Sequence, residues 1–407
     1  MDPGLGAAFR PAAGKKPGRI RKRPAGADAI NNRVLNIAVN TRLLLPGKLE
    51  GIGWFTYQAF RRIVVQHPDI TFYFIFDRPY SNEFVFAGNV KPVLLYPPAR
   101  HPVLFYLFFE FAVSRFLQKA GADLFVSPDG FLSGRYKGPQ LPVFHDLNFM
   151  HKPDFVPWLT GKYYTHFFPK YAAMARRIAT VSEYSKADIA NTFQYPTGRI
   201  DVVYNGVHEI FAPVDDVAAQ ATRERFAGGR PYFVYIGALH KRKNIGNMLR
   251  AFDRFRVTDQ QHHKLLIVGA PMFGSGDIRK VYQGMRYRDD VVFVGRQYEH
   301  ELRGIVASAR GLLLVSYFEG FGIPIIEAME CDVPVIASRV TSMPEVAGEA
   351  ALLVDPSSVD QIALAIGRLA RDEGLRKSLV EKGRQQKKRF SWDKTARLLW
   401  ESIEKCL

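Results

Sequence analysis

The sequence has few cysteines and no long apolar run. Only Cys331 and Cys406 occur among its 407 residues, and neither stands at a metal-ligand spacing, so we expect a reducing compartment, the cytoplasm. The longest apolar run, Val103 to Val113, contains Glu110 and falls short of the roughly 18 to 20 residues that cross a bilayer. Residues 1–30 have no apolar core, so no secretory signal is expected there.

Several catalytic motifs are missing too. No Asp-x-Asp pair and no His/Cys/carboxylate set with metal-site spacing occurs, so we expect a mechanism that needs no metal or other cofactor. The absence of a Walker A loop and of G-x-S-x-G argues against a P-loop kinase and a serine hydrolase. Gly51 and Gly53 form only a bare G-x-G, because Thr56 stands where the dinucleotide-binding pattern needs its third glycine.

What the chain has in excess is positive charge. Its 56 Lys and Arg against 39 Asp and Glu give a net charge of +17, and the part that follows residue 28 still carries +12. This charge suits phosphate-bearing ligands, an anionic membrane surface or nucleic acid. Because no zinc-finger spacing, basic recognition helix or aromatic RNA-binding signature is present, nucleic acid is not an expected partner. Residues 1–30 are interpreted as a flexible basic tail.

The chain length suits two domains. From Leu35 onward, short apolar runs alternate with helical patterns, and this alternation restarts after Phe211 to Pro213. Near-continuous apolar strands between helices predict parallel sheets with helices on both faces, which is an α/β fold. The predicted parts are the tail 1–30, a first Rossmann-like domain 31–210, a second 211–388, and a C-terminal amphipathic helix within 389–407 with Ser391 as its N-cap.

The aromatic segment from Val103 to Val113 has two interpretations. It forms a core helix, or it is an acceptor-side surface that touches a membrane. Its composition favours the core helix, but the sequence leaves both open.

The stretch "SYFEGFGIPIIEAM", from Ser316 to Met329, places Glu319 and Glu327 on either side of a glycine-broken turn. Pro324 is expected as the first residue of a helix, where its missing N–H costs nothing. The free N–H groups of that helix start attract phosphate or sugar oxygens, and the two carboxylates can accept hydrogen bonds from hydroxyls. Alternatively, Glu319 only ends a strand and Glu327 only favours the helix start.

A cationic turn follows another predicted strand. In "YIGALHKRKN" the strand ends at Gly237, and Asn244 opens an amphipathic helix. Cations beside a helix N-terminus form a diphosphate clamp, so Arg242 and Lys243 are predicted ligands. Lys241 is expected to be a solvated surface residue.

His145 and Asp146 directly follow a predicted strand of the first domain in "VFHDL". A histidine at a strand end can donate to a reacting hydroxyl or accept from it. A purely structural histidine is the alternative, and Asp146 is expected to be a turn or cap residue.

Taken together, these stretches resemble the GT-B retaining glycosyltransferases of family 4. The E-x7-E motif of that family is matched by Glu319 and Glu327, and the likeness spans residues 34–395. The other matching pieces are "GALHKRKN", "ATVSEYSKADI", "IDVVYNGV", "FHDL" and "PVIASRVTSMPEVAGEAALLVDP". The resemblance implies two Rossmann-like domains that face a central cleft, with the C-terminal helix crossing back to the N-terminal domain.

The resemblance also implies roles for individual residues. Glu319 contacts the donor sugar, Glu327 the ribose hydroxyls, and Arg242 with Lys243 the diphosphate, while His145 lies near the transferred sugar. The implied catalytic residues are His145 and Glu319, and the implied donor-binding residues are Gly53, Gly237, Arg242, Lys243, Asn244, Gly320, Phe321, Gly322 and Glu327. One departure is Ala238, where many members carry an arginine.

The expected function is retaining transfer of a hexosyl group from a nucleotide sugar to a glycan or lipid-linked acceptor in cell-surface polysaccharide synthesis. The style of the motifs suggests mannosyl from GDP-mannose, and the expected location is the cytoplasm, with peripheral contact to the anionic inner face of the cytoplasmic membrane. The alternative is a non-catalytic nucleotide-sugar-binding or assembly subunit. A nucleic-acid-binding protein, suggested only by charge, is a third hypothesis.

Overall fold

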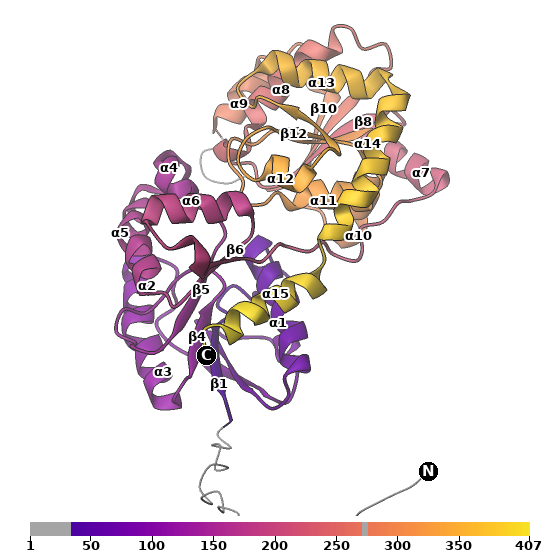
Figure 1. The fold of residues 1–407 in the computed structure, drawn as a ribbon. Coiled ribbons are helices and arrows are strands. Elements are labelled where there is room, and N and C mark those ends of the chain that lie inside the picture. The colour runs from indigo at the N-terminus through magenta and orange to yellow at the C-terminus, as the bar shows by residue number, and fades with distance from the viewer. Residues whose placement is uncertain (1–33, 271–275) are drawn as a thin grey trace, which may run out of the picture. The chain divides into compact units, whose positions relative to one another are not determined.

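The computed structural model describes residues 34–270 and 276–407, and Leu35–Leu407 form one compact unit. Two parallel β-sheets, each with helices on both faces, make up this unit (Figure 1). We call the part around the first sheet the first domain and the part around the second sheet the second domain. The prediction of two Rossmann-like α/β domains is thereby confirmed, whereas the predicted tail 1–30 lies outside the described residues.

The first sheet has seven parallel strands in the spatial order β3-β2-β1-β4-β5-β6-β7. Its strands are β1 (Asn36–Asn40), β2 (Thr71–Phe76), β3 (Val90–Leu94), β4 (Leu124–Ser127), β5 (Gln140–Phe144), β6 (Ile178–Thr180) and β7 (Ile200–Val202). The register places Val39 opposite Phe74 on one side and Val126 on the other.

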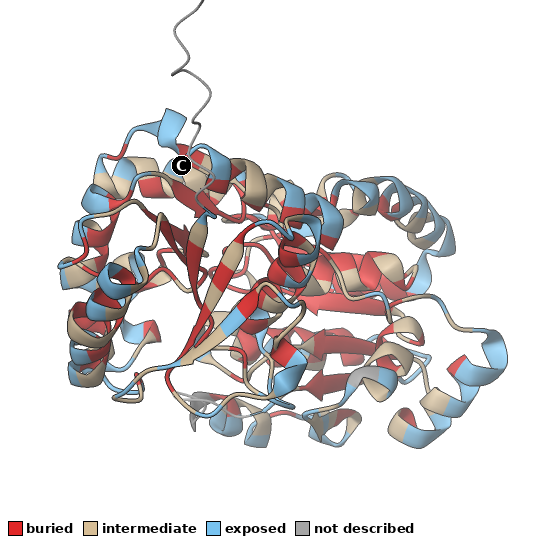
Figure 2. Cartoon of the chain, turned by 90° about the horizontal axis from the view of Figure 1, so that it is seen from below, coloured by how far each residue is buried: buried red, intermediate tan, exposed pale blue. Residues whose placement is uncertain are grey.

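The second sheet has six parallel strands in the order β10-β9-β8-β11-β12-β13. Its strands are β8 (Tyr232–Ile236), β9 (Lys264–Val268), β10 (Val291–Gly295), β11 (Gly311–Leu314), β12 (Val335–Ser338) and β13 (Ala351–Val354). All residues of the central strands β11 and β12 are buried, whereas the edge strand β10 is partly exposed. Figure 2 shows this buried interior, with exposed residues on the outer sides of the helices.

Helices connect the strands. In the first domain these are α1 (Gly51–Gln66), α2 (Pro102–Leu107), a π-helical turn (Phe108–Val113), α3 (Ser114–Ala120), α4 (Asn148–His151), α5 (Trp158–Met174) and α6 (Glu183–Phe193). In the second domain they are α7 (Asp216–Ala227), α8 (Ile245–Arg256), α9 (Gly276–Gln283), α10 (Glu299–Ala307), α11 (Ile323–Glu330), α12 (Met343–Ala347), α13 (Val359–Arg371) and α14 (Glu373–Gln386). Short 3-10 turns lie at Asn82–Phe84, Pro153–Phe155, Thr197–Arg199, Lys241–Lys243, Arg288–Asp290 and Lys387–Arg389.

The final helix, α15 (Trp392–Glu404), packs on α1 of the first domain. Ser391 caps it by accepting a hydrogen bond from the N–H of Lys394 at 3.3 Å, as predicted. Ser402 Oγ donates to Asp201 Oδ2 at 2.7 Å, and the ring of Trp400 stacks on His67 at 3.6 Å. The prediction that the C-terminal helix crosses back to the N-terminal domain is confirmed.

The aromatic segment packs mainly into the core, as its composition favours, and its contact with a membrane stays a prediction. Phe105, Phe108 and Phe109 face the core, while Tyr106 and Leu107 are exposed. Glu110 is buried because its carboxylate accepts hydrogen bonds from the N–H groups of two residues in the loop before β5. No helix in the described part of the chain is long and apolar enough to cross a membrane.

Two helix starts differ slightly from the predicted ones. The helical pattern of the sequence predicts a helix from about Trp54 to Gln66, but α1 begins three residues earlier, at Gly51, because Glu50 already adopts the extended conformation of an N-cap. Helix α11 begins at Ile323, so Pro324 is its second residue, where a missing N–H is equally harmless. The domain boundaries themselves stay predictions.

Candidate active site

Both sheets reverse their strand order at one point. In the second sheet this point lies between β8 and β11, which are neighbours in the sheet although β9 and β10 lie between them in the sequence. Ligands of open α/β sheets bind at the carboxyl ends of the strands beside such a point. One loop there is the cationic turn after β8. The other, residues 315–322 between β11 and α11, is called the Glu319 loop. The structure therefore brings the two predicted motifs together.

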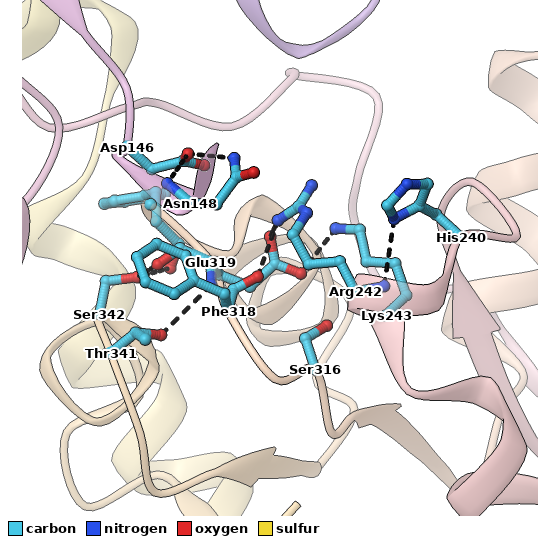
Figure 3. A network of polar contacts seen from close by, with 12 residues as sticks. Asp146, Asn148, His240, Arg242, Lys243, Ser316, Phe318, Glu319, Thr341 and Ser342 are labelled. Atoms are coloured by element: carbon cyan, nitrogen blue, oxygen red, sulfur yellow. Dashed lines mark hydrogen bonds and ion pairs between the residues drawn. The ribbon is translucent and has the colours of Figure 1, made fainter. Parts of the chain in front are cut away.

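Three charged side chains meet between these loops. Arg242 Nη1 donates to Glu319 Oε2 at 2.8 Å, and Lys243 Nζ donates to Glu319 Oε1 at 2.6 Å. Figure 3 shows both cations pointing toward the carboxylate. Arg242 Nη1 also donates to the carbonyl oxygen of Phe318 at 2.8 Å. Because Glu319 is only 6% exposed, these interactions are shielded from water.

The cations control the ionisation of Glu319. Burial by itself raises the pKa of Glu319, but Lys243 and Arg242 outweigh burial and hold the pKa at about 2. Burial lowers the pKa of the Lys243 ammonium, and the Glu319 carboxylate opposes that change. Glu319 therefore stays ionised at physiological pH, and an anion that binds Arg242 and Lys243 shares these cations with it.

Two hydroxyl groups after β12 support the Glu319 loop. The N–H of Glu319 donates to Thr341 Oγ1 at 3.3 Å. Ser342 Oγ donates to the carbonyl oxygens of Glu319 at 2.9 Å and Phe321 at 3.1 Å (Figure 3). Neither residue was predicted, although both lie in the "PVIASRVTSMPEV" stretch that carries part of the family resemblance.

The start of α11 provides backbone donors beside this cluster. Gly322 is its N-cap with a φ of +98°, a conformation that favours glycine. The side chain of Phe321 is buried, with its ring 5.4 Å from that of Phe390. Only its backbone is therefore available to a ligand.

Glu327 lies within α11 and has no polar partner for its carboxylate among the described residues. Its side chain is half-buried, and burial raises the pKa of Glu327 to about 7. A carboxylate that is partly removed from water and has no partner among the described residues costs free energy, so it is ready to accept hydrogen bonds from ligand hydroxyls.

Asn244 holds the cationic turn in place. Its Nδ2 donates to the carbonyl oxygens of Val315 at 2.9 Å and Pro356 at 2.6 Å, and its φ of +57° lies in the left-handed region. The amide side chain therefore joins the turn to the segments that directly follow β11 and β13. Lys241 is exposed, as predicted.

His145 approaches the Glu319 loop from the first domain. Its Nε2 lies 2.9 Å from the carbonyl oxygen of Pro128, which can only accept, so Nε2 carries the proton. Burial lowers the pKa of His145, so the ring is neutral and Nδ1 is an acceptor. A Cβ on Gly320 would lie 2.0 Å from the carbonyl oxygen of His145. Only glycine fits at position 320.

The remaining predicted residues lie elsewhere in the fold or have local contacts. Gly53 is in the first turn of α1, where a Cβ would meet Leu43 O at 2.8 Å. Gly237 ends β8 beside the cationic turn. Asp146 accepts a hydrogen bond from the N–H of Asn148 at 3.0 Å and is a turn residue, as predicted. In residues 34–270 and 276–407, no three His, Cys, Asp or Glu side chains gather as they do around a metal ion.

Known protein families match both halves of the chain. The profile described as Glycosyltransferase Family 4 matches residues 39–209, and the profile described as Glycosyl transferases group 1 matches residues 216–386. Together they cover both sheets and the whole site described above.

Individual relatives are more distant. The chain is 29% identical over 252 residues to the O-antigen chain mannosyltransferase B of Escherichia coli, covering 62% of this chain and 66% of that one. It is 25% identical over 255 residues to the O-antigen chain mannosyltransferase RfbU of Salmonella typhimurium, covering 63% and 67%. The chain thus matches about two thirds of the length of these relatives.

A solved structure with the same fold is the sucrose-phosphate synthase of Thermosynechococcus elongatus. The TM-score is 0.72 at 20% identity, and the match covers 91% of this chain and 98% of that one. At this identity the likeness concerns the fold alone.

Proposed function

Because this chain belongs to the GT-B glycosyltransferases that the Family 4 and group 1 profiles describe, we propose that it transfers a hexosyl group from a nucleotide sugar, with retention, to a glycan or lipid-linked acceptor. The proposal rests chiefly on the cluster of Arg242, Lys243 and Glu319 at the strand-order reversal of the second sheet. Cations beside a helix N-terminus are suited to a diphosphate, and the adjacent carboxylate is suited to sugar hydroxyls.

The proposed reaction breaks the bond between the anomeric carbon and the diphosphate oxygen and forms a bond from that carbon to the acceptor oxygen on the same face. Arg242 and Lys243 stabilise the negative charge that develops on the leaving diphosphate. The departing phosphate oxygen accepts the proton of the acceptor hydroxyl, so no side chain has to act as a general base. Glu319 and His145 orient the sugar.

The position of the proton on the His145 ring determines which ring nitrogen can contact the sugar. Since Nε2–H donates to Pro128 and the ring is neutral, Nδ1 accepts a hydrogen bond from a sugar hydroxyl. Glu327 in turn accepts hydrogen bonds from the ribose hydroxyls, which replace the partners that its carboxylate lacks in the described residues.

The names of the relatives support a mannosyl donor. Both the Escherichia coli and the Salmonella typhimurium relatives are named as O-antigen chain mannosyltransferases. We therefore propose GDP-mannose as the donor and a cell-surface polysaccharide precursor as the acceptor.

A thermal-shift panel of GDP, UDP, ADP and their sugars tests the donor. We expect GDP and GDP-mannose to raise the melting temperature, because a ligand present at 100 times its Kd stabilises the folded state by about 2.7 kcal/mol. ADP-glucose is the matched control and should leave the melting temperature unchanged. A shift with UDP-sugars alone would contradict the GDP-mannose assignment, and no shift with any of them would contradict the proposed function.

The membrane contact is proposed for one surface of the first domain. Five large apolar side chains on α2 and α5 are exposed, and these two helices contact each other. We call this set the α2/α5 surface: Val103, Tyr106, Leu107, Trp158 and Leu159. Lys162 and Lys170 lie on the same helix as Trp158, and Lys162 Nζ is 6.0 Å from its ring. Exposed apolar residues beside cations suit an anionic bilayer.

Flotation with vesicles tests this surface. Trp158 is 75% exposed, and we expect Trp158→Ser to reduce binding to phosphatidylglycerol-containing vesicles by about tenfold, since inserting a large apolar side chain contributes about 1.5 to 3 kcal/mol. The matched control is Val217→Ser on α7, where the side chain is 81% exposed outside the α2/α5 surface. Equal loss in both variants, or no binding by the unaltered protein, would contradict the proposal.

A further inference from the structure

A carboxylate of the second domain lies at the beginning of a first-domain helix. Glu345 on α12 accepts hydrogen bonds from the N–H of Glu183 at 2.9 Å and from the N–H of Tyr184 at 3.1 Å, one with each carboxylate oxygen. These N–H groups belong to the first two residues of α6 and have no partner within the helix. The carboxylate also lies at the positive end of the helix dipole. The two domains are therefore joined by a charge-assisted, two-point contact.

The same end of α6 holds the Glu319 loop. Ser182, the N-cap of α6, donates through Oγ to the carbonyl oxygen of Gly320 at 2.8 Å and accepts from the N–H of Ser185 at 3.1 Å. Ser185 Oγ lies 3.4 Å from the carbonyl oxygen of Gly320 and 3.5 Å from that of His145. The start of α6 thus contacts the residue next to Glu319 and the residue proposed to orient the sugar.

The Glu319 loop packs closely against residues of the first domain. As noted above, the carbonyl oxygen of His145 occupies the space beside Gly320. The ring of Phe318, on the other side of Glu319, is stacked on His151 at 5.9 Å and meets Tyr184 edge-on at 6.0 Å. Both neighbours of Glu319 in the chain are therefore held by first-domain residues.

We propose that Glu345 is a positioning residue, which ties α12 to the start of α6 so that the Glu319 loop keeps its place relative to His145. Its catalytic consequence rests on the proposed function, but the contact itself does not. A carboxylate is needed because two N–H groups require two acceptor oxygens, of which glutamine supplies one. Burial and the nearby Glu345 carboxylate both raise the pKa of the Tyr204 hydroxyl. The side-chain Nε2 of Gln386 donates to the backbone carbonyl oxygens of Glu345 and Val346, which holds α12 itself in place.

Hydrogen exchange measures the contact directly. In Glu345→Ala we expect the amides of Glu183 and Tyr184 to exchange about tenfold faster, the factor that corresponds to losing a hydrogen bond to a charged group. Glu345→Gln retains one acceptor and should give an intermediate rate. The matched control is Glu349→Gln, a solvent-exposed carboxylate of the same domain whose one partner among the described residues is Lys382, at 3.1 Å.

Kinetics distinguish positioning from simple stabilisation. With GDP-mannose as the probe, we expect Glu345→Ala to lower kcat for transfer or donor hydrolysis by about tenfold. The affinity for GDP should stay within about twofold, because the cations proposed to bind the diphosphate lie wholly in the second domain. A kcat of Glu345→Gln that lies between those of the alanine variant and the unaltered protein supports the same conclusion. If the alanine variant fails to fold, the glutamine variant is compared directly with the unaltered protein.

Three results would overturn the inference. Unchanged exchange at Glu183 and Tyr184 in Glu345→Ala means that the contact does not order α6. Faster exchange with unaltered kcat means that the contact has no role in positioning, and a parallel fall of kcat and GDP affinity means general destabilisation. If the unaltered protein processes no nucleotide sugar, the proposed function fails, and the exchange measurement still decides whether the contact exists.

Discussion

Replacing Glu319 by glutamine is expected to lower sugar transfer by about 10²- to 10³-fold, the size of effect seen when one preorganised polar contact to a transition state is removed. Binding of GDP is expected to persist or become tighter, because Arg242 and Lys243 no longer share their charge with a carboxylate at 2.8 and 2.6 Å. Glutamine has nearly the same shape, so the loop keeps its packing. Initial rates with GDP-mannose and calorimetric titration with GDP measure the two effects.

The same substitution should destabilise the protein when no nucleotide is bound. It leaves two partly buried cations without their buried counterion, and the cost of breaking a fully buried ion pair from one side, about 3 to 5 kcal/mol, is the upper bound here. Bound GDP should restore much of this loss. The matched control is Glu330→Gln on the same segment, whose carboxylate pairs with Lys387 at 2.8 Å near the surface. A fall in GDP affinity in parallel with transfer would show that Glu319 helps to bind the diphosphate.

Replacing Glu327 by glutamine is expected to stabilise the protein at alkaline pH and to weaken nucleotide binding. Burial raises the pKa of Glu327 from 4.5 to about 7, so between these values the folded state binds a proton that the unfolded state has lost. Stability therefore falls as pH rises through this window, and the loss remains above pH 7. It amounts to up to about 3 kcal/mol, since one pKa unit corresponds to 1.36 kcal/mol.

Urea unfolding at two pH values measures this effect. Glu327→Gln should be more stable than the unaltered protein at pH 8.5, and the difference should disappear below pH 4.5, where both side chains are neutral. We also expect GDP affinity to fall by about 10- to 100-fold, because hydrogen bonds to a charged group contribute about 1.5 to 3 kcal/mol. Glu330→Gln is again the control. If its GDP affinity falls as much as that of Glu327→Gln, the assignment of Glu327 to the ribose is wrong.

The sequence was sufficient to place the cationic turn and Glu319 at the same edge of a parallel sheet. Each follows an apolar strand, and parallel strands end at a common edge of the sheet. The sequence pattern did not predict the short strands β6 and β7 or the edge strand β3. Three residues are too few to show a period, and Pro92 within β3 is tolerated because that strand is at the edge of the sheet.

Contacts between the two domains could not be predicted in this way. Ser182 and Gly320 are 138 residues apart in the chain, and Glu183 and Glu345 are 162 residues apart. Nothing in the local pattern of either stretch indicates that the N-cap of one domain meets a loop of the other. Such pairs depend on how two separately folded surfaces fit together.

The sequence by itself determined the two parallel sheets, the C-terminal helix with its Ser391 cap, and the chemical character of both loops, because strand and helix periods and helix caps are local properties of the chain. Only the tertiary structure decided the partners. It paired Glu319 with Arg242 and Lys243, left the carboxylate of Glu327 without a partner in the described residues, and placed Glu345 at the start of α6. Ionisation and hydrogen bonding depend on the distances and burial that result when remote segments pack together.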